Sequence, residues 1–426
     1  MDNTASLETL CKAIVDCPHS TPKWKDEGVF VIRNYNIKQG CLDFSNASYV
    51  DEDIYLKRTR NAVPEPEDLV ISREAPMGEI CMIPNGLRCC LGQRLVLIKV
   101  NKEKCNPHFL LYIMQSQYVQ SQIGAADKTG SIVSNLKIPE LKGLCIPIVR
   151  RVEQDKIGYV LSLITEKIQL NKKINIELEA LVKTIYEYWF VQFEFPDENG
   201  RPYKSSGGKM VWNEELKREI PDGWEVGTLE NKIDFQRGLS YSSDDIKDNT
   251  GIPMINLASI GRNQNYIPEG IKHYKGVFGE NDIVKNGDML IACTDLTRLA
   301  EIVGCPIWVP SSNKGFLYSM DLAKINILEN SRLSSSYLYM TLRTDFYHKY
   351  IKRFATGTNV LHLNLNGVYW YLMTFPPKEL QIKFHEIVSP MFQAIQENTL
   401  ESKELESLRD FLLPLLMNGQ VTIKSA

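Results

Sequence analysis

The sequence predicts an α+β protein with an internal repeat: two similar mixed α/β domains and two long helices that pair antiparallel as a coiled coil. Three observations carry this prediction. Residues 151–195 show a sustained heptad pattern, the same pattern returns 227 positions later, and short strand-like runs precede each copy in the same order. Such a repeat is expected to have a pseudo-two-fold axis, as in a dimer fused into one chain.

The first long helix is predicted at residues 151–195, where apolar residues recur at alternating steps of four and three. At about 1.5 Å per residue it would be roughly 55–65 Å long. Two polar residues, Asn171 and Asn175, interrupt the seam at its centre. The apolar seam residues are Ile157, Leu161, Ile164, Ile168, Leu178, Val182, Ile185 and Trp189.

The second long helix is predicted at residues 379–418, where Asn398 and Ser402 occupy the polar centre. Antiparallel pairing would place Asn171 opposite Ser402 and Asn175 opposite Asn398, a polar layer that fixes register. The alternative is that these residues face solvent and the helices pack elsewhere. The seam residues of this copy are Phe384, Val388, Met391, Ile395, Leu405, Arg409, Leu412 and Leu416, with Arg409 a poor match to Val182.

The remaining chain divides by composition. Short apolar runs such as "GVFVIRNYNI" and "DLVISREA" predict strands before the first helix, and "GIPMINLASIGR" and "GDMLIACTD" predict their counterparts after it. A stretch rich in Pro, Gly, Ser and charge reads as a linker. The predicted order is domain 1 at 1–150, helix at 151–195, linker at 196–221, domain 2 at 222–378, helix at 379–418 and tail at 419–426.

Composition limits the class of protein. The chain of 426 residues has a net charge of −3 and no apolar run long enough for a membrane span, so no membrane association is expected. The ten cysteines form no C-x-x-C pair, which favours reduced thiols in a cytoplasm. The six histidines make no metal-binding pattern. A near-neutral chain that binds DNA must use local basic clusters or a partner.

No motif for catalysis is found. "KSSGGK" lacks the spacing of a phosphate-binding loop, and neither an amino-methylation motif nor a nuclease element is seen. We therefore expect no catalytic residue and no metal in this chain. Two similar heads on a rigid spacer could measure a distance, and DNA offers a regular one of about 34 Å per turn.

Candidates for DNA contact are basic and polar residues in loops or at strand ends. A Gly between hydroxyls and a cation suits close approach to phosphate and base edges, and this arrangement occurs in both halves. For each candidate the alternative is an ordinary turn or surface residue. The candidates are Arg33, Lys57, Arg58, Arg60, Arg73, Lys128, Thr129, Ser131, Asn256, Arg262, Arg298, Lys352, Arg353, Thr356, Thr358 and Asn359.

The ordered set of features resembles the DNA-specificity (S) subunit of type I restriction-modification systems. The resemblance covers essentially the whole chain and is carried by the repeat of domain plus long helix and by "IPDGWEVGTLENKIDFQRG", "GIPMINLASIG", "GDMLIACTD" and "LYSMDLAKINI". The first half lacks the Gly-Trp opening of the second, so its N-terminal edge is expected to be shorter.

The resemblance implies two target-recognition domains that each read one half of a bipartite double-stranded DNA target, with the coiled coil setting the spacer. It implies a non-catalytic subunit that docks two methyltransferase subunits on the outer helix faces, and restriction and translocase subunits that join later. The cofactors S-adenosylmethionine, ATP and Mg²⁺ would then belong to partner subunits, and the chain would be cytoplasmic and nucleoid-associated in a prokaryote. The alternatives are a catalytic restriction or methylation polypeptide and a protein-binding coiled-coil scaffold.

Overall fold

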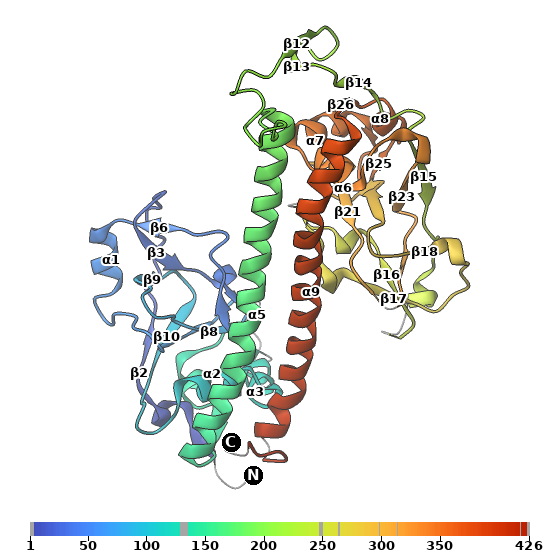
Figure 1. Cartoon of the computed structure of the whole chain (residues 1–426). Helices are drawn as coiled ribbons and strands as arrows, with labels where there is room; N and C mark the ends of the chain where they lie inside the picture. The colour runs from blue at the N-terminus through green and yellow to red at the C-terminus, as the bar shows by residue number, and fades with distance from the viewer. Residues whose placement is uncertain are drawn as a thin grey trace. The chain divides into compact units, whose positions relative to one another are not determined.

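The computed structural model describes residues 4–127, 135–246, 250–262, 265–297, 299–312, 314–417 and 419–423. The chain forms two compact units (Figure 1). Unit 1 comprises Met1–Leu170 and Glu401–Ala426, and unit 2 comprises Asn171–Leu400. Two long helices each contribute one part to unit 1 and one part to unit 2, so neither helix belongs to a single unit.

Unit 1 is a mixed α/β domain whose main sheet has four antiparallel strands in the order β2-β10-β7-β8. A smaller sheet has the order β6-β3-β9, with β3 and β9 parallel. Its strands are β1 (Thr4–Ser6), β2 (Cys11–Asp16), β3 (Val29–Ile32), β4 (Ile37–Lys38), β5 (Cys41–Leu42), β6 (Tyr49–Val50), β7 (Leu69–Ser72), β8 (Ile80–Met82), β9 (Cys89–Leu91), β10 (Leu95–Val100) and β11 (Cys145–Pro147). Its short helices are α1 (Glu52–Arg58), α2 (Pro107–Gln115), α3 (Gln117–Asp127) and α4 (Ile138–Lys142).

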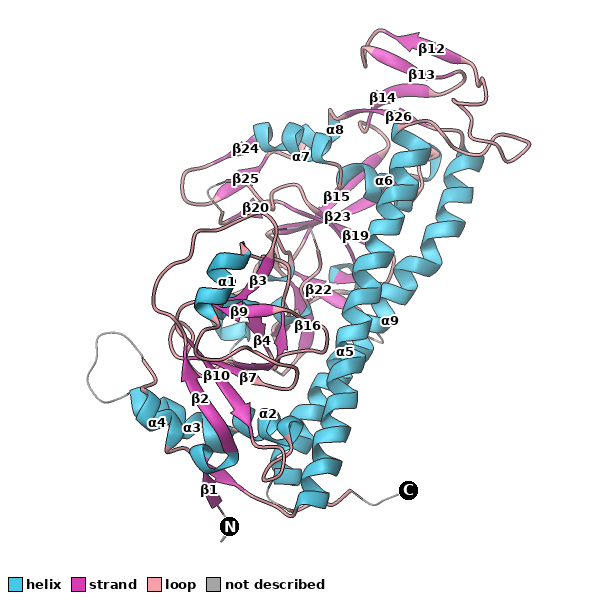
Figure 2. Cartoon of the chain, turned by 90° about the vertical axis from the view of Figure 1, so that its left-hand side faces the viewer, coloured by secondary structure: helices cyan, strands magenta, loops and turns pink. Residues whose placement is uncertain are grey.

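Unit 2 has a main antiparallel sheet in the order β15-β23-β19-β21 and a second sheet in the order β17-β16-β22-β18 (Figure 2). Its strands are β12 (Met210–Asn213), β13 (Arg218–Pro221), β14 (Glu225–Thr228), β15 (Ile233–Arg237), β16 (Ile252–Ile255), β17 (Lys272–Tyr274), β18 (Ile283–Val284), β19 (Met289–Ala292), β20 (Thr294–Asp295), β21 (Pro306–Trp308), β22 (Phe316–Tyr318), β23 (Leu322–Ile327), β24 (Ala355–Thr356), β25 (Leu361–Leu363) and β26 (Leu372–Phe375). Its short helices are α6 (Ser335–Leu342), α7 (Asp345–Ile351) and α8 (Asn366–Tyr369).

The two units share one arrangement of strands, the common frame. Each unit has a four-stranded antiparallel sheet and a second sheet that contains one parallel pair: β3 with β9 in unit 1, and β16 with β22 in unit 2. Each unit also pairs an early strand with the strand just before a long helix: β1 with β11 in unit 1, and β14 with β26 in unit 2. The duplication that the sequence predicted is therefore present in the topology of the strands.

One glycine is required at the same point of both frames. Gly28 precedes β3 with φ +130, and a Cβ there would lie 2.4 Å from the carbonyl oxygen of Val50. Gly251 precedes β16 with φ +128, and its Cβ would lie 2.3 Å from the carbonyl oxygen of Tyr274. Neither position accepts a side chain, since both the backbone conformation and the space exclude one.

The two long helices are α5 (Arg151–Tyr186) and α9 (Lys378–Met417). The first ends nine residues before the predicted Phe195, because one π-helical turn (Glu187–Val191) follows it and Phe193 then takes a positive φ of 65. In α9 an exposed proline, Pro390, interrupts the backbone ladder on the outer side of the helix, where solvent can satisfy the freed carbonyl.

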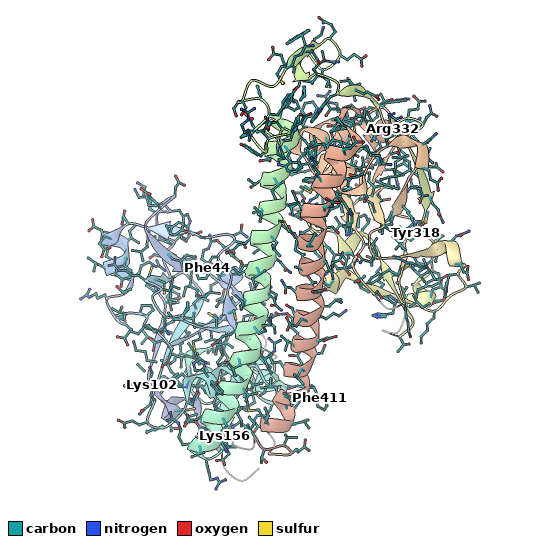
Figure 3. The ribbon with its side chains drawn as sticks, viewed as in Figure 1. Phe44, Lys102, Lys156, Tyr318, Arg332 and Phe411 are labelled. Carbon is teal, nitrogen blue, oxygen red and sulfur yellow. The ribbon has the colours of Figure 1, made fainter. Side chains whose placement is uncertain are left out.

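In unit 1, the first part of α5 packs against the last part of α9. Ile157 and Leu161 of α5 lie in one apolar core with Leu416 and Met417 of α9. Lys156 of α5 donates to the carbonyl of Ile423 at 3.1 Å (Figure 3). Because residues early in α5 meet residues late in α9, the helices are antiparallel in this unit.

The same seam includes one charged residue. Arg409 stands where the first copy has Val182, and its side chain is only 11% exposed. It lies 3.1 Å from the carboxylate of Asp410, so the charge of this poor match to the repeat is paired.

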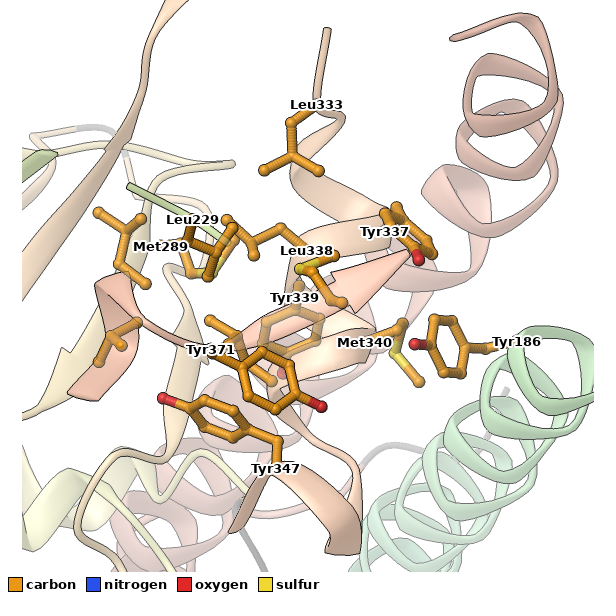
Figure 4. Packing of buried hydrophobic residues seen from close by; sticks show 14 of the residues in the cluster. Tyr186, Leu229, Met289, Leu333, Tyr337, Leu338, Tyr339, Met340, Tyr347 and Tyr371 are labelled. Carbon is orange, nitrogen blue, oxygen red and sulfur yellow. The ribbon is translucent and has the colours of Figure 1, made fainter. Parts of the chain in front are cut away.

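In unit 2, the last part of α5 packs against the first part of α9. Val182, Tyr186 and Trp189 share a core with Phe384 and Val388. Aromatic rings dominate this core, which also includes the buried side chains of α6 (Figure 4). Tyr186 bonds through its hydroxyl to Thr341 Oγ1 at 3.0 Å, which satisfies the polar end of a buried ring.

The centre of the seam is polar, as expected. Asn398 Nδ2 donates to Asn175 Oδ1 at 2.9 Å, and Asn175 Nδ2 donates to Thr399 Oγ1 at 3.1 Å and to the carbonyl of Ile395 at 3.2 Å. Asn171 is fully buried and donates to the carbonyl of Asn398 at 3.3 Å. These asparagines therefore face the partner helix rather than solvent. The pairing of Asn171 with Ser402 stays a prediction, because these two residues belong to different units.

A glutamine joins each long helix to its domain in the same way. Gln154, 2% exposed, accepts from the backbone N–H of Asn106 at 2.9 Å and donates to the carbonyl of Val149 at 2.9 Å. Gln381, 1% exposed, accepts from the N–H of Ser334 and donates to the carbonyl of Pro376, at 2.9 and 2.8 Å. Each glutamine thus connects the start of α2 or α6 with the segment that leads into α5 or α9.

The predicted linker contains a β-hairpin. Strands β12 and β13 pair antiparallel from Met210 with Pro221 to Asn213 with Arg218. Just before the hairpin, Tyr203 stacks on Phe195 with ring centroids 4.6 Å apart, and Phe195 stacks on Trp224 at 5.5 Å. The Gly- and Ser-rich composition conceals this order because the pairing residues lie only at the end of the stretch. None of the helices within the described ranges is both long and apolar enough to cross a membrane.

Candidate nucleic-acid interface

Arg33 follows β3, and its guanidinium stacks on two aromatic rings. Its guanidinium carbon lies 4.7 Å from the ring centroid of Trp24 and 4.5 Å from that of Tyr35. Both rings reach solvent, with exposures of 39% and 41%. The arrangement presents a stacked cation at the surface of unit 1, which is a geometry that suits contact with a nucleic acid.

The basic residues of the run Lys57–Arg60, at the end of α1, have two different environments. Arg58 is 8% exposed and donates to the carbonyls of Leu91, Ser20 and Pro18 at 2.8, 2.9 and 3.1 Å. Burial lowers the pKa of Arg58 from its ordinary value. It therefore supports the fold, and the expectation of a direct DNA contact is corrected to a positioning role.

Lys57 and Arg60 are exposed and, together with Arg58, line a pocket of about 290 Å³ in unit 1. The pocket wall also includes Asp16 and Asn61. Of the basic run, only Lys57 and Arg60 remain placed to meet an external anion.

Arg73 follows β7 and is also turned into the domain. Its guanidinium donates to both carboxylate oxygens of Asp16 at 2.9 and 2.8 Å, to the carbonyl of Leu136 at 2.9 Å and to Asn135 Oδ1 at 3.2 Å. With its side chain 12% exposed, it bridges segments that lie far apart in the sequence. Its expected DNA contact is replaced by this bridging role.

Asn256 of unit 2 occupies the place that Arg33 has in unit 1, directly after the first strand of the parallel pair. It is 3% exposed, accepts from the N–H of Ala258 at 2.9 Å and donates to the carbonyl of Gly270 at 2.6 Å. These bonds consume its amide, so a direct base contact by Asn256 does not agree with the structure.

The second unit presents a hairpin instead. Strands β24 and β25 pair antiparallel beside β20, and the hairpin tip carries Thr356, Thr358 and Asn359, all exposed (Figure 2). Lys352 and Arg353 lie in the short 3₁₀ turn that leads into β24, with Arg353 exposed. The structure thus brings together all five of the candidates from this region.

The tip depends on Gly357, which has φ +132. A Cβ at this position would lie 2.0 Å from the carbonyl oxygen of Val360. Only glycine permits this closure, so the shape of the tip follows from one residue.

The remaining candidates differ in what the structure says of them. Arg262 is exposed and lies 3.2 Å from the carboxylate of Glu301. Lys128, Thr129, Ser131 and Arg298 lie outside the described residues. Sequence reasoning missed Trp24 and Tyr35, although an aromatic residue two positions from Arg33 is a visible signal for a stacked cation.

Most of the cysteines are buried in the two units. All ten are free thiols. Burial raises the pKa of Cys89 to about 12 and that of Cys90 to about 11, which leaves both protonated at neutral pH. Among the residues that the structure describes, no group of His, Cys, Asp and Glu could hold a metal ion.

Comparison with known proteins shows what the chain is similar to. Residues 17–180 match the family model described as "Type I restriction modification DNA specificity domain". The type I restriction enzyme MjaIX specificity subunit of Methanocaldococcus jannaschii is 26% identical over 370 residues, covering 84% of this chain and 78% of that relative. The HindI specificity subunit of Haemophilus influenzae is 21% identical, covering 83% of this chain and 86% of the relative.

Over most of its length the chain is similar to type I restriction-modification specificity subunits, and residues 17–180 match the DNA specificity domain of that family. This similarity supports a part in DNA specificity rather than in catalysis. The fold agrees: the crystal structure of the S subunit from M. genitalium matches 100% of this chain and 96% of that chain, with a TM-score of 0.63 at 15% identity. The family and fold class that the sequence predicted are confirmed.

Proposed function

We propose that unit 1 and unit 2 read the two halves of one bipartite double-stranded DNA target, and that α5 and α9 set the spacer between the halves. One observation carries this proposal: the two units share a frame and differ in the side chains that it presents. Directly after the first strand of the parallel pair, unit 1 has the ring-stacked Arg33. At the same place unit 2 has Asn256, whose amide is hydrogen-bonded within the unit. Different surface residues on one frame suit two different half-sites.

The length and continuity of the two long helices support the proposed spacer role. Each is continuous through residues of both units, and α5 with 36 residues corresponds to about 54 Å of helix. This length exceeds one turn of DNA, about 34 Å. Polar contacts at Asn175 and Asn398 specify the register in which the helices pair, and register determines spacing.

The net charge of −3 implies that other subunits share in holding the DNA. Type I specificity subunits belong to systems that include methyltransferase and restriction subunits. We propose that two methyltransferase subunits bind this chain and that restriction and translocase subunits join the complex afterwards. Phosphate contacts by the partners would supply much of the salt-dependent affinity. S-adenosylmethionine, ATP and Mg²⁺ would be bound by those partners.

The proposed docking surface for a methyltransferase subunit lies on α5. Val152, Tyr159, Leu163 and Leu170 follow at spacings of seven, four and seven, which places them on one helix face. Their exposures are 62%, 66%, 46% and 51%. A contiguous exposed apolar stripe on a helix commonly marks a protein interface.

The docking proposal is tested by Tyr159→Asp, which puts a charge at the centre of this stripe. We expect at least a tenfold loss of methyltransferase-subunit binding, measured by titration calorimetry. Gln169→Asp is the matched control, because Gln169 is exposed on the same helix but outside the stripe. Equal affinity for both variants would contradict docking on α5.

The DNA-reading proposal is tested by expressing the chain with its methyltransferase subunit in a host that lacks other modification systems. Sequencing of modified adenines is expected to return one motif with two defined halves and an undefined gap. A chain that methylates DNA when purified alone would instead support the catalytic alternative. A complex without any sequence preference would support the scaffold alternative.

A further inference from the structure

We propose that Arg33 reads one base of the first half-site by pairing two guanidinium N–H donors with the O6 and N7 acceptors of a guanine in the major groove. This inference rests on the proposed function, since it names a reading residue for unit 1.

The stack fixes the plane of the guanidinium. With the Trp24 and Tyr35 ring centroids 4.7 and 4.5 Å from its guanidinium carbon, the side chain loses much of its freedom before any ligand binds. A planar fork that is already oriented loses less entropy when it forms two parallel hydrogen bonds. Such preorganisation favours a specific bidentate contact.

The surrounding backbone supports the stack. Asn36 Oδ1 accepts from the N–H of Arg33 at 3.0 Å, which holds the turn after β3. The hydroxyl of Tyr35 lies 3.3 Å from Ser48 Oγ, which restrains the second ring. Opposite the Arg33 stem, Gly92 leaves room: a Cβ there would lie 3.2 Å from Arg33 Cγ and 2.8 Å from the carbonyl oxygen of Ile32.

The donors of Arg33 have no partner in the described part of the chain, since its guanidinium makes neither an ion pair nor a hydrogen bond there. Other arginines of unit 1 differ. Arg58 donates to three carbonyls and Arg73 to Asp16. Arg88 also stacks on a ring, that of Tyr55 at 4.3 Å, yet it pairs with Glu52. Arg33 is thus a stacked cation with five N–H groups available.

The comparison between units favours a base over a phosphate. Phosphates are the same in every sequence, so a phosphate-binding position has no reason to differ between two recognition domains. At this position unit 1 has a half-buried, ring-stacked Arg33 and unit 2 has a buried Asn256. Arginine paired with guanine O6 and N7 is the commonest specific base contact.

The test uses the complete complex with its methyltransferase subunits and the bipartite motif mapped for the wild type. Affinities for the motif and for versions with one substituted base pair in the first half-site are measured at several salt concentrations. Variants are Arg33→Ala and Arg33→Lys, with Arg88→Ala as the matched control. Arg88→Ala also removes a ring-stacked arginine, but one whose charge is already paired.

We expect Arg33→Ala to reduce discrimination at one G·C pair of the first half-site roughly 10- to 100-fold. Arg33→Lys is expected to lose most of the same discrimination while it keeps the salt dependence, because lysine retains the charge and lacks the fork. Arg88→Ala should discriminate as the wild type does. Unchanged reading of the second half-site shows that each variant is folded and assembled.

Two results would overturn the proposal. A uniform loss of affinity for all sequences, with a salt slope reduced by about one, would assign Arg33 to a phosphate. Unchanged discrimination in Arg33→Ala would remove it from the interface. In both cases the wild type still reads a bipartite motif. A wild-type complex without sequence preference would overturn the proposed function as well.

Discussion

At the scale of single residues, three arginines of unit 1 carry the same charge and have different roles. Arg58 meets backbone carbonyls, Arg73 meets a carboxylate, and Arg33 meets only aromatic rings. Hydrogen bonds to buried carbonyls and carboxylates occupy the donors that recognition would need. The set of partners inside the domain therefore decides which cation is left for DNA.

We expect the side chain of Gln154 to hold the start of α5 against the rest of unit 1. Gln154→Ala would leave the N–H of Asn106 and the carbonyl of Val149 without partners, at a cost of about 1–3 kcal/mol. We expect faster amide exchange at the start of α2, measured by hydrogen exchange with mass spectrometry. Gln169→Ala on the exposed side of the same helix should change nothing. Equal protection in both variants would contradict the role of Gln154.

At the scale of elements, the β24–β25 hairpin is closed by one glycine. Gly357→Ala adds a Cβ where only 2.0 Å is available to the carbonyl of Val360. We expect the hairpin tip to reshape and methylation to fall at the second half-site while the first half-site is still read. The measurement is the frequency of modified adenines for each half-site.

Gly287→Ala is the control for this substitution. Gly287 also has a positive φ, +88, but its Cβ would meet nothing within 4 Å. The same backbone penalty then applies without the collision. Loss of second half-site reading in both variants would assign the effect to strain in general rather than to the hairpin tip.

The polar centre of the seam is a second element whose energy can be measured. Asn398→Ala removes the 2.9 Å bond to Asn175 and should lower stability by about 1 kcal/mol. Asn175→Ala should do the same, and the double variant should lose less than the sum because the pair is lost once. Urea unfolding of the four proteins gives the coupling. Strictly additive losses would show that the two side chains act separately.

At the scale of the whole molecule, the spacer hypothesis predicts a change in the DNA target. Deleting one heptad from α5 and the facing heptad from α9 keeps the seam in phase and shortens the pair by about 10 Å. The gap in the target should shrink by about three base pairs, as read from the methylated motif. Deleting a heptad from one helix alone should put the seam residues of the two helices out of register and abolish methylation of the target by the complex. An unchanged gap after the paired deletion would refute the spacer.

Part of this architecture could be predicted from sequence. The predictable features depend on residues close together in the chain, and the others depend on contacts between distant residues. The long helices and their polar centre follow from local periodicity, which needs no knowledge of distant residues. The roles of Arg58 and Arg73 do not, because their partners lie 33 to 63 positions away. The hairpin at 210–221 was missed because its neighbours resemble a linker in composition. The recurrence of Gln154 as Gln381 was visible, but its bonds were not.

Gly28 and Gly251 have a consequence for how this protein can change over generations. They serve the same backbone need in both units, while the side chains a few residues later differ. Substitution of either glycine threatens folding, and a selection for function would remove it. If Arg33 and the hairpin tip read DNA as proposed, substitution there leaves the frame intact and alters only the bases that are read. New DNA targets would then arise by drift at a few positions, without a passage through unstable intermediates.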